Sequence, residues 1–94
     1  MTNKIIFGLL LSVFISSTAF AQLTQEQKSA KEKGLTLYQQ SDWYDSQPLL
    51  EKAAKAGDST SQYYLAEAIR LSKRYTTSDA RKWYEAAAEQ GNLY

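Results

Sequence analysis

Apolar residues recur with a helical period in two stretches of this chain. In DARKWYEAAAEQG, from Asp79 to Gly91, they fall at positions i, i+3, i+4, i+7 and i+8. On an α-helix these positions form one stripe, which is buried against a neighbouring element. The stretch DSQPLLEKAAKAG, from Asp45 to Gly57, has small or apolar residues at the same places and ends in the same glycine. The shift of 34 residues, from Gly57 to Gly91, is typical of helical repeats.

Two more helices are expected between and before these stretches. Thr24 and Gln27 have the spacing of a capping box, which predicts a helix over about residues 25–40. A helix through QYYLAEAIRLSK, beginning at one of residues 58–60, precedes the last stretch, which is capped by one of residues 78–79. The pattern therefore predicts an all-α protein of two antiparallel helical hairpins.

Pro48 and Gly34 both need a structural reason to lie in a helix. We expect a turn over residues 41–44 and an N-cap at Asp45 or Ser46. Pro48 then falls in the first turn of its helix, where a missing N–H has no intrahelical partner. Gly34 costs about 1 kcal/mol of helix propensity relative to alanine, so we expect it to allow the close approach of a neighbouring helix.

The first 21 residues have the three parts of a secretory signal peptide. Lys4 precedes an apolar run over residues 5–15, and Ala19-Phe20-Ala21 is an A-x-A cleavage site. The apolar run is shorter than the roughly 20 residues of a membrane span, which argues against the alternative of an uncleaved anchor. We expect cleavage before Gln22 and a mature protein that is periplasmic or secreted.

Composition excludes several classes of function. The chain has 11 basic and 10 acidic residues, and Lys4 is the only charged residue of the leader, so the mature part is balanced in charge. This balance argues against nucleic acid as a partner, and no basic patch indicates a stable membrane contact. Without histidine or cysteine there is no disulfide, no lipid attachment site and no Ser-His or Cys-His pair. We therefore expect no metal and no cofactor.

The carboxylate pair Glu85 and Glu89 is the remaining candidate for catalysis. Its members are four residues apart on one helical face, and Arg81 lies four residues before Glu85. An ordinary surface ion pair explains this spacing, because acid-base catalysis needs burial that a polar face lacks. We therefore predict a protein that is not an enzyme, and keep an enzyme or enzyme-associated factor acting on cell-wall material as the alternative.

The second unit carries a resemblance to a known family. WYEAAAEQGN, from Trp83 to Asn92, follows Asp79-Ala80-Arg81 and resembles the second helix of the Sel-one-like repeat, a relative of the tetratricopeptide repeat. Residues 61–69 are similar to the first helix of that repeat. Residues 34–57 resemble a plain tetratricopeptide unit. The resemblance implies a short right-handed α-solenoid and a protein-binding role, without naming a partner.

This reading divides the chain into four segments. The signal peptide (1–21) is followed by a tetratricopeptide-like hairpin (22–57) and a Sel-one-like hairpin (58–91). Residues 92–94 have the pattern of a further helix, which indicates a truncated array or a chain completed by another copy through its last helix.

The candidate binding residues lie on the polar face of the third helix and, from the first unit, on the first helix. Trp83 and Tyr84 match packing positions between helices, and we expect them to face a neighbour as core residues. In the resembled repeats, by contrast, the first helix of each unit lines a concave groove. This implies a groove for a protein or peptide, with an immunity-type protein that masks an envelope-acting toxin as one variant. Its predicted lining residues are Lys31, Tyr38, Tyr63, Glu67 and Arg70.

Overall fold

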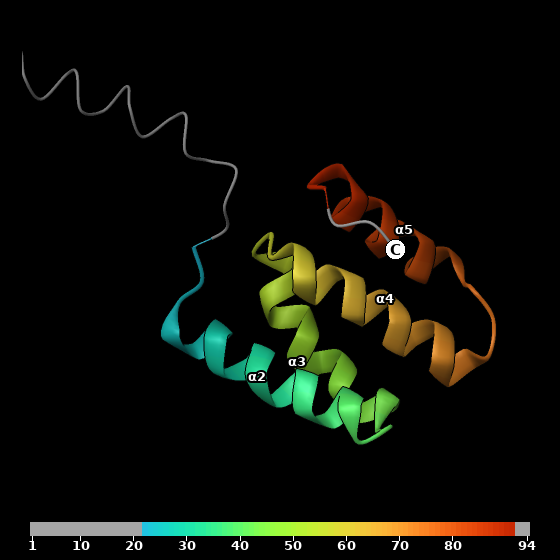
Figure 1. The fold of residues 1–94 in the computed structure, drawn as a ribbon, viewed down its shortest axis with the longest axis horizontal. Coiled ribbons are helices and arrows are strands. Elements are labelled where there is room, and N and C mark those ends of the chain that lie inside the picture. Colours follow the sequence, from blue (N-terminus) through green and yellow to red (C-terminus); the bar gives the residue numbers. More distant parts are fainter. Residues whose placement is uncertain (1–21, 92–94) are drawn as a thin grey trace, which may run out of the picture.

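The computed structural model describes residues 22–91, which form four α-helices and no strand. The helices are α2 (Gln25–Gln39), α3 (Trp43–Lys55), α4 (Ser59–Lys73) and α5 (Ser78–Glu89). Each helix packs against the next one along the chain, and α2 also touches α4 (Figure 1). The prediction of an all-α fold is confirmed. The predicted leader and residues 92–94 lie outside the described residues.

Every helix in this range begins at a side-chain cap. The side chains of Thr24, Asp42, Asp58 and Thr77 each accept a hydrogen bond from the backbone N–H three residues later. Such a bond satisfies one of the amides that the first turn of a helix leaves unpaired. At α2 the bond is reciprocal, because the backbone N–H of Thr24 also donates to Oε1 of Gln27 at 2.9 Å. The predicted capping box is therefore confirmed.

The predicted start of α3 was wrong by several residues. Asp42 is the N-cap and its Oδ1 accepts from the backbone N–H of Asp45 at 3.3 Å, so Trp43 and Tyr44 are helical and not part of the turn. Two aspartates three residues apart offer competing caps, and the earlier one is used. The cap of α5 is likewise Thr77, one residue before the predicted range.

Pro48 consequently lies in the interior of α3, as its sixth residue. It cannot donate the hydrogen bond that the carbonyl of Tyr44, four residues earlier, would accept in a regular helix. Its side chain is exposed, so no packing depends on the ring.

Replacing Pro48 with alanine is therefore expected to stabilise the protein. The restored bond outweighs the lost rigidity of the unfolded chain, and we expect a net gain of about 1 kcal/mol. Thermal unfolding followed by circular dichroism measures this gain as a higher Tm. The variant Gln39→Ala, at another exposed helical position, is the control. A Pro48→Ala protein that melts at a lower temperature than the parent would contradict this account of α3.

The core runs between the helices as two adjoining clusters. The first contains Leu50, Ala54 and Leu65, and joins α3 to α4. The second contains Ala66, Ala80 and Tyr84, and joins α4 to α5. Small residues dominate because the helix axes approach closely, and alanine lets backbones come together with little space between them.

Gly34 provides the close approach that its position predicts. An added Cβ at this residue would lie 2.8 Å from Cγ of Leu50 and 3.1 Å from its backbone nitrogen. Leu50 is fully buried and has no room to move away. Glycine at position 34 lowers helix propensity, but it allows α2 and α3 to pack closely at Leu50.

The second hairpin buries the residues that were expected to face a further neighbour. Tyr84 is only 7% exposed, and both Tyr84 and Trp83 pack against side chains of α4. The fully exposed positions of α5 are polar: Ser78, Asp79, Arg81, Lys82, Glu85 and Glu89. The apolar stripe of α5 thus packs against α4 of its own hairpin. Self-association through this helix stays a prediction, and the exposed positions of α5 do not support it because they are polar.

Glutamines hold the turn between α3 and α4 against the end of α5. Nε2 of Gln90 donates to the carbonyl of Gly57 at 2.9 Å and to Oε1 of Gln62 at 3.0 Å. Gln62 in turn donates to the carbonyl of Ala54 at 3.1 Å. These bonds join the two hairpins at one end of the molecule.

Candidate functional site

Four of the five predicted site residues lie close together on α2 and α4. Tyr38 of α2 bonds to Glu67 of α4, Glu67 pairs with Arg70, and Tyr84 of α5 contacts Glu67 and Tyr63 and completes the group. We call this group the tyrosine cluster. With the ring that lies between Tyr38 and Tyr63, its members are Tyr38, Tyr63, Tyr64, Glu67, Arg70 and Tyr84.

The four tyrosine rings form a continuous row. The ring centroids of Tyr38 and Tyr64 are 5.0 Å apart, those of Tyr64 and Tyr63 also 5.0 Å, and those of Tyr63 and Tyr84 5.9 Å. All three contacts are edge-to-face, with the positive edge of one ring against the negative face of the next. The row links α2 to α5 across α4, although α2 and α5 share no direct helix packing.

Glu67 is the centre of the polar part of the cluster. Its Oε2 accepts a hydrogen bond from the hydroxyl of Tyr84 at 2.6 Å, and its Oε1 accepts from Nη2 of Arg70 at 2.8 Å. The hydroxyl of Tyr38 donates to the same Oε1 at 3.4 Å. Nε of Arg70 also donates to the Tyr84 hydroxyl at 3.1 Å. One carboxylate therefore connects three helices.

This network shifts the pKa values of its members. Burial alone would raise the pKa of Glu67, but the hydrogen bonds from Tyr84, Arg70 and Tyr38 outweigh it and hold that pKa below its usual value. Burial and then the Glu67 carboxylate raise the pKa of Tyr84 and of Tyr38 to about 12 each. The hydrogen bond to Glu67 raises the pKa of Arg70 above its usual value. Near neutral pH the cluster thus has fixed charges: one carboxylate, one guanidinium and neutral phenols.

Exposure differs across the cluster. The side chain of Glu67 is 14% exposed, whereas that of Arg70 is 38% exposed. Arginine has five N–H donors, and Nη1 carries two that make none of the bonds described above. The guanidinium can therefore bind a further acceptor from solvent while it stays paired with Glu67.

Lys31 is the predicted site residue that lies outside the cluster. Its Nζ is 3.1 Å from Oδ2 of Asp58, the cap of α4, and both side chains are largely buried. Burial alone would raise the pKa of Asp58, but bonds from Ser61 and then Lys31 hold it below its usual value. Lys31 therefore fastens α2 to the beginning of α4.

Tyr84 is the member of the cluster that sequence reasoning assigned elsewhere. Its spacing on α5 correctly predicts a packing residue, and its ring is buried as expected. Its hydroxyl, however, reaches back to α4 and binds two predicted site residues. The signal available in the sequence was that a tyrosine, and not phenylalanine, occupies a buried position, because a buried phenol needs a hydrogen-bond partner.

No protein-family model, no curated protein and no solved structure matches this chain. The Sel-one-like resemblance therefore stays a prediction carried by the residues of the second hairpin. The function must be argued from the geometry of the chain itself.

The carboxylates considered for catalysis are in solvent. Glu85 and Glu89 are both exposed on α5, as expected of a surface pair. Within residues 22–91 no three metal-ligating side chains come together, and no helix is long and apolar enough to cross a bilayer.

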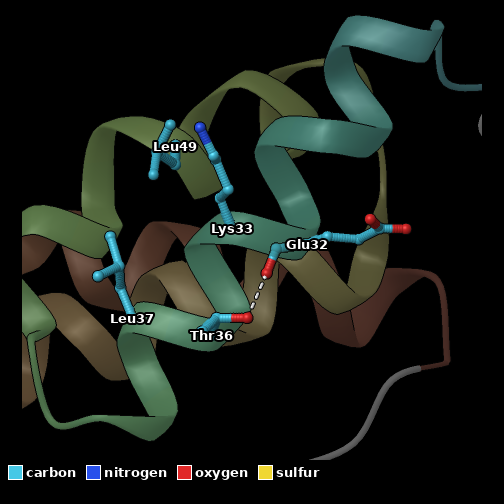
Figure 2. A pocket seen from close by; sticks show the side chains of 5 residues that line it. All are labelled: Glu32, Lys33, Thr36, Leu37 and Leu49. Carbon is cyan, nitrogen blue, oxygen red and sulfur yellow. Dashed lines mark hydrogen bonds between the residues drawn. The ribbon is translucent and has the colours of Figure 1, made fainter.

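A hollow of about 510 Å³ lies on the surface between α2 and α3, away from the tyrosine cluster (Figure 2). Leu37 and Leu49 form its apolar wall, with Lys33 beside them. The hydroxyl of Thr36 is already bonded to the carbonyl of Glu32 at 3.0 Å. None of the predicted site residues lines this hollow.

Proposed function

We propose that this protein is a non-enzymatic interaction module of the periplasm or extracellular space. It binds another protein or a peptide through the tyrosine cluster. The observation that carries the proposal is the assembly of a rigid aromatic row around one charged pair, from three helices that are separate in the sequence.

The composition of the cluster suits protein recognition. Tyrosine and arginine are enriched among the residues that contribute most to protein interfaces. Because the rings pack on one another and the hydroxyls of Tyr38 and Tyr84 are bonded to Glu67, these side chains lose little freedom when a partner binds. Arg70, at the edge of the network, can donate to a carboxylate or carbonyl oxygen of the partner.

The remaining parts of the proposal concern location and shape. The leader pattern over residues 1–21 supports export, and the 34-residue repeat supports stacking of the hairpins as a short right-handed solenoid. An immunity-type role, in which the cluster masks a toxic enzyme of the envelope, is one form of this function.

Site-directed photo-cross-linking in cells tests the proposal. A benzoylphenylalanine residue in place of Tyr63 is expected to capture one envelope protein, whereas the same residue at Glu85, on the exposed face of α5, captures none. The ring of Tyr63 is half-buried at the surface of the cluster, so the probe keeps an aromatic group in the row.

A pair of charge variants sharpens the result. Arg70→Gln is expected to reduce capture from position 63 by about tenfold, because it removes a charge-assisted contact. Lys82→Gln, on the polar face of α5, leaves capture unchanged. Thermal unfolding of both variants shows that the fold is retained. Equal capture from positions 63 and 85, or full capture by the Arg70→Gln protein, would rule out the cluster as the binding surface.

A further inference from the structure

A second hollow lies where the two turns within the hairpins meet, and it is separate from the tyrosine cluster. Its volume is about 350 Å³. It is bounded by the turn between α2 and α3 on one side and by the last turn of α4 on the other, at the same end of the molecule (Figure 1). We call it the turn hollow, and its rim residues are Ser41, Asp42, Trp43, Tyr44, Leu71, Ser72 and Arg74.

Two rim residues have a backbone conformation that disfavours side chains. Ser41 has φ 65° and Arg74 has φ 70°, and they are the non-glycine residues of the described chain with positive φ. Glycine is the usual residue at this position after a helix, because a Cβ is strained there. Gly57 occupies the equivalent place after α3. The backbone N–H groups of Gly57 and of the next residue bond to the last turn of α3, just as those of Ser41 and of the next residue bond to the last turn of α2. A side chain is thus retained at two strained positions that face one hollow.

Aromatic exposure is concentrated in the same two turns. Tyr44 is 75% exposed and Tyr75, which follows Arg74, is 65% exposed. Among residues 22–91 these are the large apolar side chains most open to solvent, and neither contributes to the core clusters. Trp43, beside Tyr44, is half-buried in the wall of the hollow.

The polar groups of the rim offer both signs of charge. In the described chain Arg74 has no carboxylate within ion-pair distance, so its guanidinium is available to an anion. One oxygen of Asp42 caps α3, and its other oxygen can accept from a hydroxyl. The hydroxyl of Ser72 donates to the carbonyl of Ile69 at 2.9 Å and accepts from Nε2 of Gln47 at 3.1 Å, so it keeps acceptor capacity only. Hydroxyl acceptors and a cation therefore surround exposed aromatic rings.

We infer that the turn hollow binds a sugar that carries a carboxylate. The apolar C–H face of a pyranose ring stacks on an aromatic side chain, its hydroxyls bond to Asp42 and the serines, and its carboxylate pairs with Arg74. A volume of 350 Å³ lies in the range of small-molecule sites. A peptide is less well matched, because the rim presents no strand edge and its apolar residues, Trp43 and Leu71, lie beside charged and hydroxyl-bearing ones.

The strained residues supply a test that separates binding from folding. Changing Arg74 to glycine relieves strain and removes the cation, so the Tm is expected to stay the same or rise while binding falls. If Arg74 had only a structural role, its replacement by glycine would lower the Tm and leave binding unchanged. Tyr44→Ala, at a site 75% exposed, is the second variant, and is expected to weaken binding without loss of stability.

Amide chemical shifts of the ¹⁵N-labelled full chain measure the binding. N-acetylmuramic acid is expected to cause saturable shifts at residues 41–44 and 72–74, and N-acetylglucosamine, which lacks the carboxylate, to bind about tenfold more weakly. Arg74→Gly is expected to weaken N-acetylmuramic acid by a similar factor. Lys28→Ala, at the opposite end of α2, leaves the titration unchanged. Tighter binding of the N-acetylglucosamine–N-acetylmuramic acid disaccharide assigns the site to a glycan chain, and equal binding assigns it to a free sugar.

Three results would overturn the inference. These are the absence of shifts at the rim residues, equal binding of N-acetylmuramic acid by the parent and the Arg74→Gly protein, and stronger rim shifts with trialanine than with the sugar. The site does not depend on the tyrosine cluster, so loss of cross-linking from Tyr63 would leave it standing.

Discussion

Changing Gly34 to alanine is expected to lower the free energy of unfolding by about 2 kcal/mol, although alanine is the better helix former. The gain in helix propensity is about 1 kcal/mol. Against it stands the contact with Leu50, whose Cγ would be 2.8 Å and whose backbone nitrogen 3.1 Å from the new Cβ. Overpacking of a dense core costs roughly 1–3 kcal/mol, and at the upper end the clash exceeds the gain.

Urea unfolding of two further proteins tests this reason. Ser29→Ala, at an exposed site of α2, is the control and is expected to change stability by less than about 0.5 kcal/mol. In a Leu50→Ala background, adding Gly34→Ala is expected to be neutral or stabilising, because the new methyl group enters the space left by leucine. A stable Gly34→Ala protein in the parent background would show that α2 and α3 have room to separate.

Changing Glu67 to glutamine is expected to lower the free energy of unfolding at pH 7 by about 2 kcal/mol. The amide keeps one acceptor oxygen but presents an NH₂ group to the donors of Tyr84 or Arg70. A buried donor left without a partner costs roughly 1–3 kcal/mol, and the half-exposed Arg70 is partly compensated by water.

The pH dependence of stability gives the same variant a second measurement. The folded pKa of Glu67 lies below its usual value of 4.5, so its stabilising contribution is complete above that pH and is lost as the pH falls through the folded pKa. The difference in unfolding free energy between the parent and Glu67→Gln is therefore expected to shrink on acidification below about pH 4.5. Asp58 titrates in both proteins and cancels from the difference.

Glu85→Gln is the matched control for this experiment. Glu85 is exposed on α5, and its substitution is expected to leave both the stability and its pH dependence close to those of the parent. A gap between the parent and Glu67→Gln that persists unchanged at low pH would mean that packing, and not the ionised carboxylate, is what glutamine disturbs.

The helices could be predicted because local rules and packing agree over most of the chain. The stripe of α5 and the caps at Thr24 and Asp58 act within a few residues, so periodicity and side-chain type reveal them. The start of α3 could not be predicted in this way. Asp42 and Asp45 are both good caps, and their spacing alone does not say which of them is used.

The candidate site was predicted on the first and third helices of the repeat pattern, and in the structure α2, α4 and α5 all contribute to it. Helical spacing places Glu67 and Arg70 on one face of α4, which is a local fact. The hydroxyl of Tyr84 reaches them because of the angle at which α5 packs on α4. Lys31 pairs with Asp58 because of where the beginning of α4 lies along α2. Neither relation follows from the spacing of residues along a single helix.

The contacts between helices also determine how fast this chain can fold. Packing runs from α2 to α3, from α3 to α4 and from α4 to α5, and the direct contact between α2 and α4 is minor. Each helix therefore packs mainly against its neighbour in the sequence, and helical proteins with such local topology fold in about microseconds to milliseconds. Glu67 and the row of rings are among the non-local links, and they join the first helix to the last. A chain without this bridge would lose one link between the first helix and the last, while the bonds of Gln90 to Gly57 and Gln62 would still join the two hairpins.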